Sequence, residues 1–134
     1  MIILVDILKK ELDMDFDTAV DHIQKILLDN GFSVMGAKAI NEIFKKKLGI
    51  MDHPRYTIIT ACGPKLAKMA LEASFDVGLL FPCSFVVYEQ NDKLIVSHVS
   101  IMKSAVILGL ASEEAMKPVI AETGKMIGAV WEKI

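Results

Sequence analysis

Thr60-Ala-Cys-Gly-Pro-Lys-Leu-Ala-Lys-Met-Ala-Leu71 is followed shortly by Val77-Gly-Leu-Leu-Phe-Pro-Cys-Ser-Phe-Val-Val-Tyr88, and the rest of the chain is organised around these two segments. β-Branched and aromatic side chains dominate residues 55–61 and predict a strand. Gly63-Pro64 ends that strand and opens a helix, because the first helical position needs no N–H donor. Residues 79–88 favour a second strand, since Pro82 and the β-branched valines disfavour a helix. We therefore expect the order strand, turn, helix, turn, strand.

Cys62 lies directly before the predicted helix N-terminus, where unpaired N–H groups and the helix dipole favour negative charge. These groups would stabilise a thiolate on Cys62. They would also hold a small anion, with Lys65 one turn inside the helix. The simpler interpretation is a small cysteine packed at a strand-to-helix corner, since cysteine often behaves as a buried apolar residue.

The central third of the chain resembles a known family. Ala61-Cys-Gly-Pro-Lys-Leu-Ala67 and Val77-Gly-Leu-Leu-Phe-Pro-Cys83 are similar to the bacterial and archaeal domain of unknown function 302 family, with its pattern close to A-C-N-P-x-x-A and V-G-L-L-L-P-C-N. Gly63 and Ser84 stand where the family usually has asparagine, so two amide side chains are missing here. The resemblance implies a compact α+β domain, similar to the TATA-binding-protein-like fold, that forms dimers. It implies no activity, because the family's function is not established.

Composition limits the classes of function. The chain has 134 residues, which predicts one domain over 1–134, and its net charge of −2 gives no reason to expect nucleic acid. No apolar run reaches the roughly 18 residues of a membrane span. The N-terminus lacks the basic start of a signal peptide, so we expect a cytoplasmic protein. The 53% hydrophobic content predicts a subunit interface, and hence a homodimer.

The cysteines and histidines do not form a recognisable metal or disulfide motif. Cys62 and Cys83 are too few for a disulfide framework, and we expect both to be reduced in a cytoplasmic setting. His22, His53 and His98 are too dispersed to provide an obvious set of ligands, and no C-x-x-C occurs. The sequence therefore predicts no metal site and identifies no cofactor.

The order of elements predicts the fold class. Strands are expected at residues 2–12, 32–38, 55–61, 79–89 and 94–99, with helices after Asp15, over 40–48 and 64–72, over 102–110 and after Ser112. This order indicates an α+β fold with a mixed, largely antiparallel sheet and helices packed on one side. Gly124 and Gly128, four residues apart in the last helix, suggest a close approach of another backbone.

His98 is the one histidine that the predicted pairing brings near a cysteine. A two-residue turn at Asn91-Asp92 would place Phe85 opposite His98, with Cys83 as its diagonal neighbour. Beside a thiol, His98 could act as a base or a ligand. The favoured interpretation is a half-buried histidine that bonds to a backbone or serine partner.

Three functional hypotheses follow. The first is a non-enzymatic homodimer that binds a small ligand or anion near Cys62, Gly63, Lys65, Cys83 and His98. The second is a thiol enzyme or sulfur-transfer protein, with Cys62 as nucleophile and Cys83 or His98 assisting. The third is a purely structural or interaction module. Ligand binding is preferred because no recognisable base with an orienting partner accompanies the cysteines, and whether the protein is an enzyme stays open.

Overall fold

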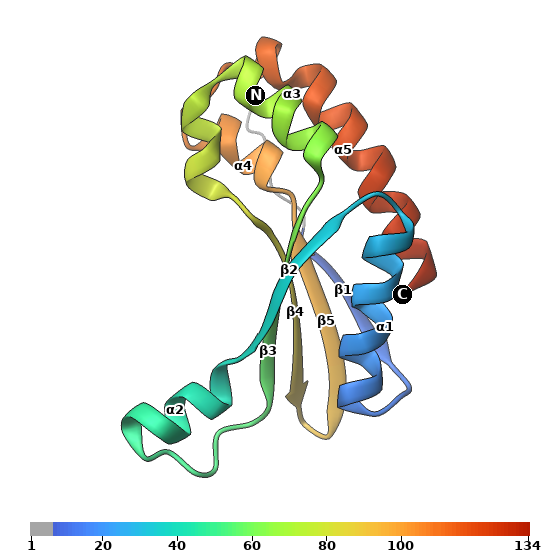
Figure 1. Cartoon of the computed structure of the whole chain (residues 1–134), viewed down its shortest axis with the longest axis vertical. Coiled ribbons are helices and arrows are strands. Elements are labelled where there is room, and N and C mark those ends of the chain that lie inside the picture. The colour runs from blue at the N-terminus through green and yellow to red at the C-terminus, as the bar shows by residue number, and fades with distance from the viewer. Residues whose placement is uncertain (1–6) are drawn as a thin grey trace.

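The computed structural model, which describes residues 7–134, contains a five-stranded sheet (Figure 1). Its strands are β1 (Ile7–Leu12), β2 (Ser33–Ala39), β3 (Tyr56–Cys62), β4 (Cys83–Gln90) and β5 (Lys93–Val99), in the spatial order β1-β5-β4-β3-β2. Each pair of neighbouring strands is antiparallel. The predicted α+β class is confirmed, whereas the expected parallel component of the sheet is wrong for residues 7–134. The segment between β3 and β4 turns back at one end of the sheet, and so β4 returns antiparallel beside β3.

Helices cover one face and one end of this sheet. They are α1 (Phe16–Asp29), α2 (Ile40–Leu48), α3 (Pro64–Ala73), α4 (Ile101–Ile107) and α5 (Glu113–Lys133). α1 and α5 lie along one face, α3 and α4 gather at one end, and α2 projects away from the body at the other end (Figure 1). Asp15 and Ser112 cap α1 and α5 by accepting hydrogen bonds from backbone N–H groups inside the first turn.

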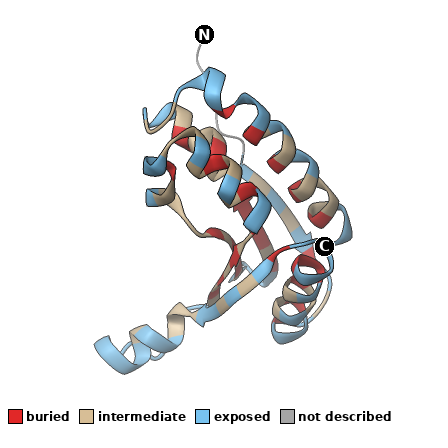
Figure 2. Ribbon diagram, turned by 45° about the horizontal axis from the view of Figure 1, so that its top comes forward, coloured by how far each residue is buried: buried red, intermediate tan, exposed pale blue. Residues whose placement is uncertain are grey.

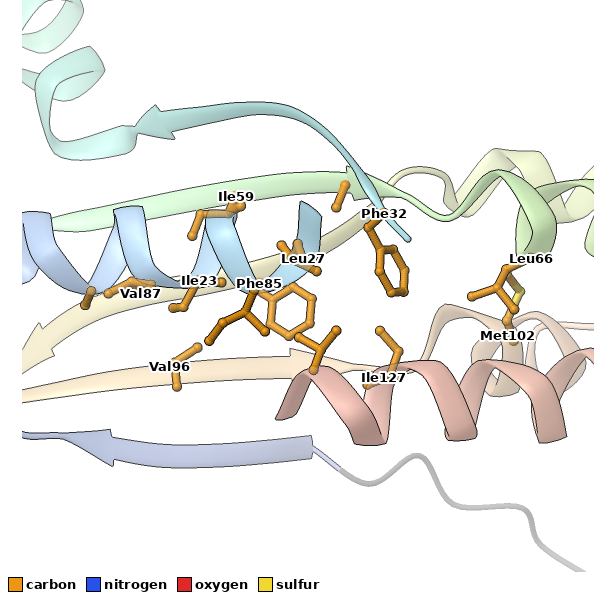
Figure 3. Packing of buried hydrophobic residues seen from close by; sticks show 14 of the residues in the cluster. Ile23, Leu27, Phe32, Ile59, Leu66, Phe85, Val87, Val96, Met102 and Ile127 are labelled. Carbon is orange, nitrogen blue, oxygen red and sulfur yellow. The ribbon is translucent and has the colours of Figure 1, made fainter. Parts of the chain in front are cut away.

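The core lies between the sheet and the α1–α5 layer. Alternate strand residues point toward the helices because side chains in a strand alternate between faces. Figure 3 shows Ile59, Phe85 and Val96 from three strands facing Leu27 of α1 and Ile127 of α5. Buried residues accordingly gather on the inner sides of the helices and the sheet, while α2 is mostly exposed (Figure 2).

The β4–β5 hairpin has the predicted register. Asn91 and Asp92 have φ angles of 53° and 62°, which two-residue turns of this kind require. The turn joins Gln90 to Lys93 and places Phe85 opposite His98. Because one side of the sheet is buried, this register decides that Phe85 and His98 face the core.

Two sequence predictions differ from the structure, and a third lies partly outside the described residues. The first strand is confirmed over Ile7–Leu12, and residues 2–6 lie outside the described residues. Residues 79–82 were expected to extend β4, but a 3-10 helix occupies Phe75–Leu80 and β4 begins at Cys83. The Ser74 hydroxyl caps this 3-10 helix by accepting from the Asp76 N–H, and Val77 is buried, which explains the local preference over a strand.

The second difference concerns the two glycines of α5. A methyl group added at Gly124 or at Gly128 would meet nothing within 4 Å, so the expected close backbone approach is wrong. α5 packs instead through larger side chains on its buried stripe, including Val119, Ile127 and Val130. The glycine face of the helix is simply not its packing face.

Candidate functional site

A strand-to-helix corner brings the two cysteines together. β3 ends at Cys62, Gly63 connects the two elements, and Pro64 opens α3 with its missing N–H at a position that needs none. A side chain at position 63 would be crowded, since an added Cβ would lie 3.1 Å from Phe32 Cε1 and 3.2 Å from Leu66 Cδ1. Glycine at this corner therefore allows Phe32 to pack closely beneath it.

Cys62 and Cys83 line one small pocket, which we call the thiol pocket. Its lining residues are Ala61, Cys62, Gly63, Leu66, Ala67, Phe81, Pro82, Cys83 and Met102. The lining is almost entirely apolar apart from the two sulfurs. The cavity volume is about 10 Å³, close to the minimum that holds one water molecule. Cys62, Gly63 and Cys83, three of the five predicted site residues, therefore meet in one place.

The other two predicted residues are held elsewhere. Lys65 Nζ lies 2.9 Å from Glu122 Oε1 of α5 and does not line the pocket. This hydrogen bond and charge hold the pKa of the Glu122 carboxyl below its usual value. The positive charge expected next to Cys62 thus pairs with a carboxylate on another helix.

His98 bonds to the backbone, as the favoured interpretation predicted. Its Nδ1 lies 2.8 Å from the Ser84 carbonyl oxygen, which can only accept, so Nδ1 carries the proton. The ring stacks on Phe85 with centroids 4.2 Å apart and an interplanar angle of 15°. Burial lowers the pKa of His98, although the Ser84 carbonyl partly opposes this shift. His98 is therefore a neutral core residue at pH 7.

The two thiols differ in their surroundings. Cys83 is buried, and this burial, followed by the nearby Cys62 side chain, raises the pKa of the Cys83 thiol to about 11. Cys62 is only partly buried. Any chemistry at neutral pH that needs a thiolate and solvent access is therefore restricted to Cys62.

The sequence missed part of the pocket. Phe81 and Met102 close it from the segment before β4 and from α4. The sequence could have assigned Phe81 to the site, because Phe81 adjoins Pro82 in the segment quoted first. The strand predicted there gave Phe81 no such role. Met102 comes from a helix that only the tertiary fold brings to this corner, so no local pattern indicates it.

Neither a metal cluster nor a membrane-spanning helix is present within residues 7–134. Within residues 7–134, no group of three or more histidine, cysteine or acidic side chains is arranged to hold a metal ion. Over the same residues, no helix is long and apolar enough to cross a membrane. The thiol pocket, where Cys62, Gly63 and Cys83 meet, is therefore taken as the candidate site.

The fold and the pocket define an α+β domain in which two free thiols share a small apolar cavity at a strand-to-helix corner. The chain belongs to the family described as Domain of unknown function DUF302, whose model matches residues 8–134. It is similar to the crystal structure of uncharacterized conserved protein DUF302 from Bacillus stearothermophilus, with a TM-score of 0.83 and 20% identity over 95% of this chain and 96% of that one. No curated protein matches the chain. The family resemblance is thus confirmed. Membership of this family implies a fold but no activity.

Burial of His98 predicts a pH-dependent stability. Because its folded-state pKa lies below the ordinary value of 6.5, the unfolded chain binds this proton more readily. The contribution of neutral His98 to the free energy of unfolding is therefore fully present above about pH 6.5, and it is lost as the pH falls. Between pH 7 and pH 5, the free energy of unfolding should therefore decrease as the unfolded chain takes up this proton.

Urea unfolding measured across this pH range tests the prediction. His98→Gln keeps an amide donor for the Ser84 carbonyl but cannot titrate, and so its unfolding free energy should vary less over the same window. Equal pH dependence in the wild type and the variant would show that other groups cause the effect.

Proposed function

We propose that the protein is a cytoplasmic homodimeric domain that binds a small ligand at the thiol pocket. The observation that carries this proposal is the convergence of Cys62 and Cys83, from two different strands, on one cavity. The apolar lining and the two sulfurs suit a small apolar or soft, sulfur-binding group. A hydrated anion fits less well, because Lys65 is engaged by Glu122 and a buried charge without a partner is costly.

Ligand entry requires a side chain to move. The cavity of about 10 Å³ holds no more than about one water molecule. Met102 is the side chain best able to make room, since methionine is unbranched and adapts its shape readily. Phe81 lies at the half-buried rim of the same cavity. Binding should therefore change the environment of Phe81 and Met102 together.

Native mass spectrometry of protein purified from its own host tests the proposal directly. We expect a bound small molecule whose removal accelerates alkylation of Cys62, because the ligand covers that sulfur. Cys62→Ala should retain less of the molecule, whereas Asp21→Ala, at an exposed α1 position outside the pocket lining, should retain all of it. Host-purified protein without a bound molecule, and without protection of Cys62, would contradict the proposal.

A thiol enzyme is the second candidate, favoured by the partial exposure of Cys62. Within the part of the chain that the structure describes, no basic side chain hydrogen-bonds to either sulfur, and His98 is directed to the Ser84 carbonyl. A nucleophilic cysteine normally has such a base beside it. Turnover of a bound molecule that Cys62→Ser abolishes would establish this candidate over simple binding.

We predict that Cys62 and Cys83 are not joined by a disulfide in the cell. Both are free in the structure, and cytoplasmic thiols are kept reduced. Cells lysed under rapid alkylation should yield protein that carries two labels per chain under denaturing conditions. An intact mass two hydrogens short, with no label, would contradict the prediction.

We also predict that the chain dimerises at micromolar concentration. Many large apolar side chains are exposed, including Met35, Leu48 and Met51, and exposed apolar surface of this kind commonly marks an interface. Sedimentation equilibrium should return twice the chain mass of 14.8 kDa. A single-chain mass over the whole micromolar range would contradict the prediction.

A further inference from the structure

Residues 40–55 form an arm that projects from the body at the end of β2 and β3 (Figures 1 and 2). The arm contains α2 and the loop that leads into β3, and α2 has no buried residue. Leu48 and Met51 expose 67% and 73% of their surface. A nine-residue helix is marginal in water without a packed face. Leu48 and Met51 therefore present apolar surface to solvent in the described part of this chain.

The arm is nevertheless held in a defined position. The Asn41 Oδ1 atom accepts a hydrogen bond from the Tyr56 N–H at 3.1 Å, which ties the start of α2 to β3. Phe44 contacts His53 edge-on with ring centroids 4.9 Å apart, which closes the loop on the helix. Gly49 ends α2 in the left-handed conformation, with its N–H bonded to Lys45 O. The arm is thus preformed and directed away from its own sheet.

A wide groove lies on the sheet face opposite the core. Its apolar floor contains Ile7, Tyr56, Val86 and Tyr88, whose positions alternate with those of the core-facing residues in the same strands. The rings of Tyr56 and Tyr88 stack with centroids 5.6 Å apart. At about 1260 Å³, this open-face groove exceeds the roughly 300–1,000 Å³ of ordinary small-molecule sites.

One end of the open-face groove is acidic. The groove continues past the β4–β5 turn into a hollow that shares Asp15 and Asp92 with it and adds Glu11 and Asp13. Lys93 is the one basic residue that lines this hollow among residues 7–134, and its contact with Glu11 is long, at 3.7 Å. The groove thus has apolar residues on its floor and an acidic end, while Lys9 and Arg55 also belong to its lining.

The arm carries positive charge and exposed apolar side chains, which complement the acidic end and the apolar floor of the groove. α2 carries three consecutive lysines, Lys45, Lys46 and Lys47, in its last turn, next to the exposed apolar residues Leu48 and Met51. Opposite charges at matching positions favour one partner and fix its orientation. The same chain therefore contains both halves of a matching pair, an apolar and basic arm and an apolar and acidic groove.

We infer that the arm of each copy occupies the open-face groove of a second copy of this chain. The two contacts are then equivalent, as a two-fold dimer requires, because each copy gives its arm and receives the other's. The lysines of one copy face the acidic end of the groove in its partner, and the apolar arm residues cover the floor. This inference rests on the proposed homodimer and states how it assembles.

Paired variants test the inference. Met51→Glu places a charge on the arm, and Ile7→Glu, at a residue 63% exposed, places one in the groove. Each variant by itself should raise the dimer dissociation constant at least tenfold, because both arm–groove contacts of its homodimer contain the substituted residue. Leu79→Glu, at a residue 74% exposed that lies outside the arm and the groove, should leave the dissociation constant unchanged.

A mixture of the two variants gives the decisive measurement. A heterodimer of Met51→Glu with Ile7→Glu contains one intact arm–groove contact, so an equal mixture should be more dimeric than either variant alone. All variants should keep the wild-type circular dichroism spectrum, since the changed side chains are exposed. Added salt should weaken the wild-type dimer, because the lysine–carboxylate contacts are screened.

The outcomes separate this inference from the proposed homodimer. A dimeric wild type that neither variant weakens, or a mixture that shows no recovery, overturns the arm–groove contact and leaves the homodimer standing. A monomeric wild type overturns both. A monomer that binds an unrelated acidic protein through the arm would assign a different partner to the same surface and would also overturn the inference.

Discussion

Replacing Phe85 with alanine is expected to lower the free energy of unfolding by about 3–5 kcal/mol. Phe85 is fully buried at the centre of the core and stacks on His98. Truncation removes its transfer free energy and leaves a cavity that surrounding strands and helices cannot fill without moving (Figure 3). Since small domains are stable by only about 5–15 kcal/mol, the loss is a large share of the total.

Urea unfolding of the variant measures this loss. Phe75→Ala is the matched control, because Phe75 is 85% exposed and makes the same chemical change at the surface. Its unfolding free energy should lie within about 0.5 kcal/mol of the wild-type value. If Phe85→Ala were as mild as the control, the core would be far more adaptable than its packing indicates.

Cys83 is expected to react with iodoacetamide at least about a hundredfold more slowly than an unperturbed thiol at pH 7. Its pKa of about 11, against the ordinary value of 9.0, reduces the thiolate fraction by about two orders of magnitude. Burial of the side chain adds a barrier to the reagent. Cys62, which is partly exposed, should be the faster of the two thiols.

Peptide-resolved alkylation of the folded protein measures both rates. The difference should disappear in denaturant, where burial no longer separates the two thiols. Cys62→Ser should leave Cys83 slow, since burial is the larger cause of its raised pKa. Equal rates in the native protein, or a faster Cys83, would remove the reason to place reactive chemistry at Cys62 and would favour packing as the role of both cysteines.

Local patterns were sufficient to predict most elements of this fold. Strand propensity before Ala61 and the Gly63-Pro64 break depend on neighbouring residues only, and they correctly predicted β3 and the start of α3. The Asn91-Asp92 turn fixes pairing by its own backbone geometry, so the opposition of Phe85 and His98 was also correct. The 3-10 helix before β4 was missed, because its Ser74 cap and the burial of Val77 outweigh the β propensity of the segment that follows.

The sequence by itself determined the α+β class, the place of Cys62 before a helix and the register of the β4–β5 hairpin, because each depends on short-range geometry. The pairing of β3 with β4 then placed Cys83 beside Cys62. The tertiary structure alone decided which distant groups meet. Lys65 pairs with Glu122, 57 positions away, because α3 lies beside α5. Met102 closes the thiol pocket because α4 packs at the same end of the sheet. α2 lies apart from its own core because the strands that carry it extend beyond the helices that cover the sheet. Such contacts follow from the spatial arrangement of whole elements, which no local pattern encodes.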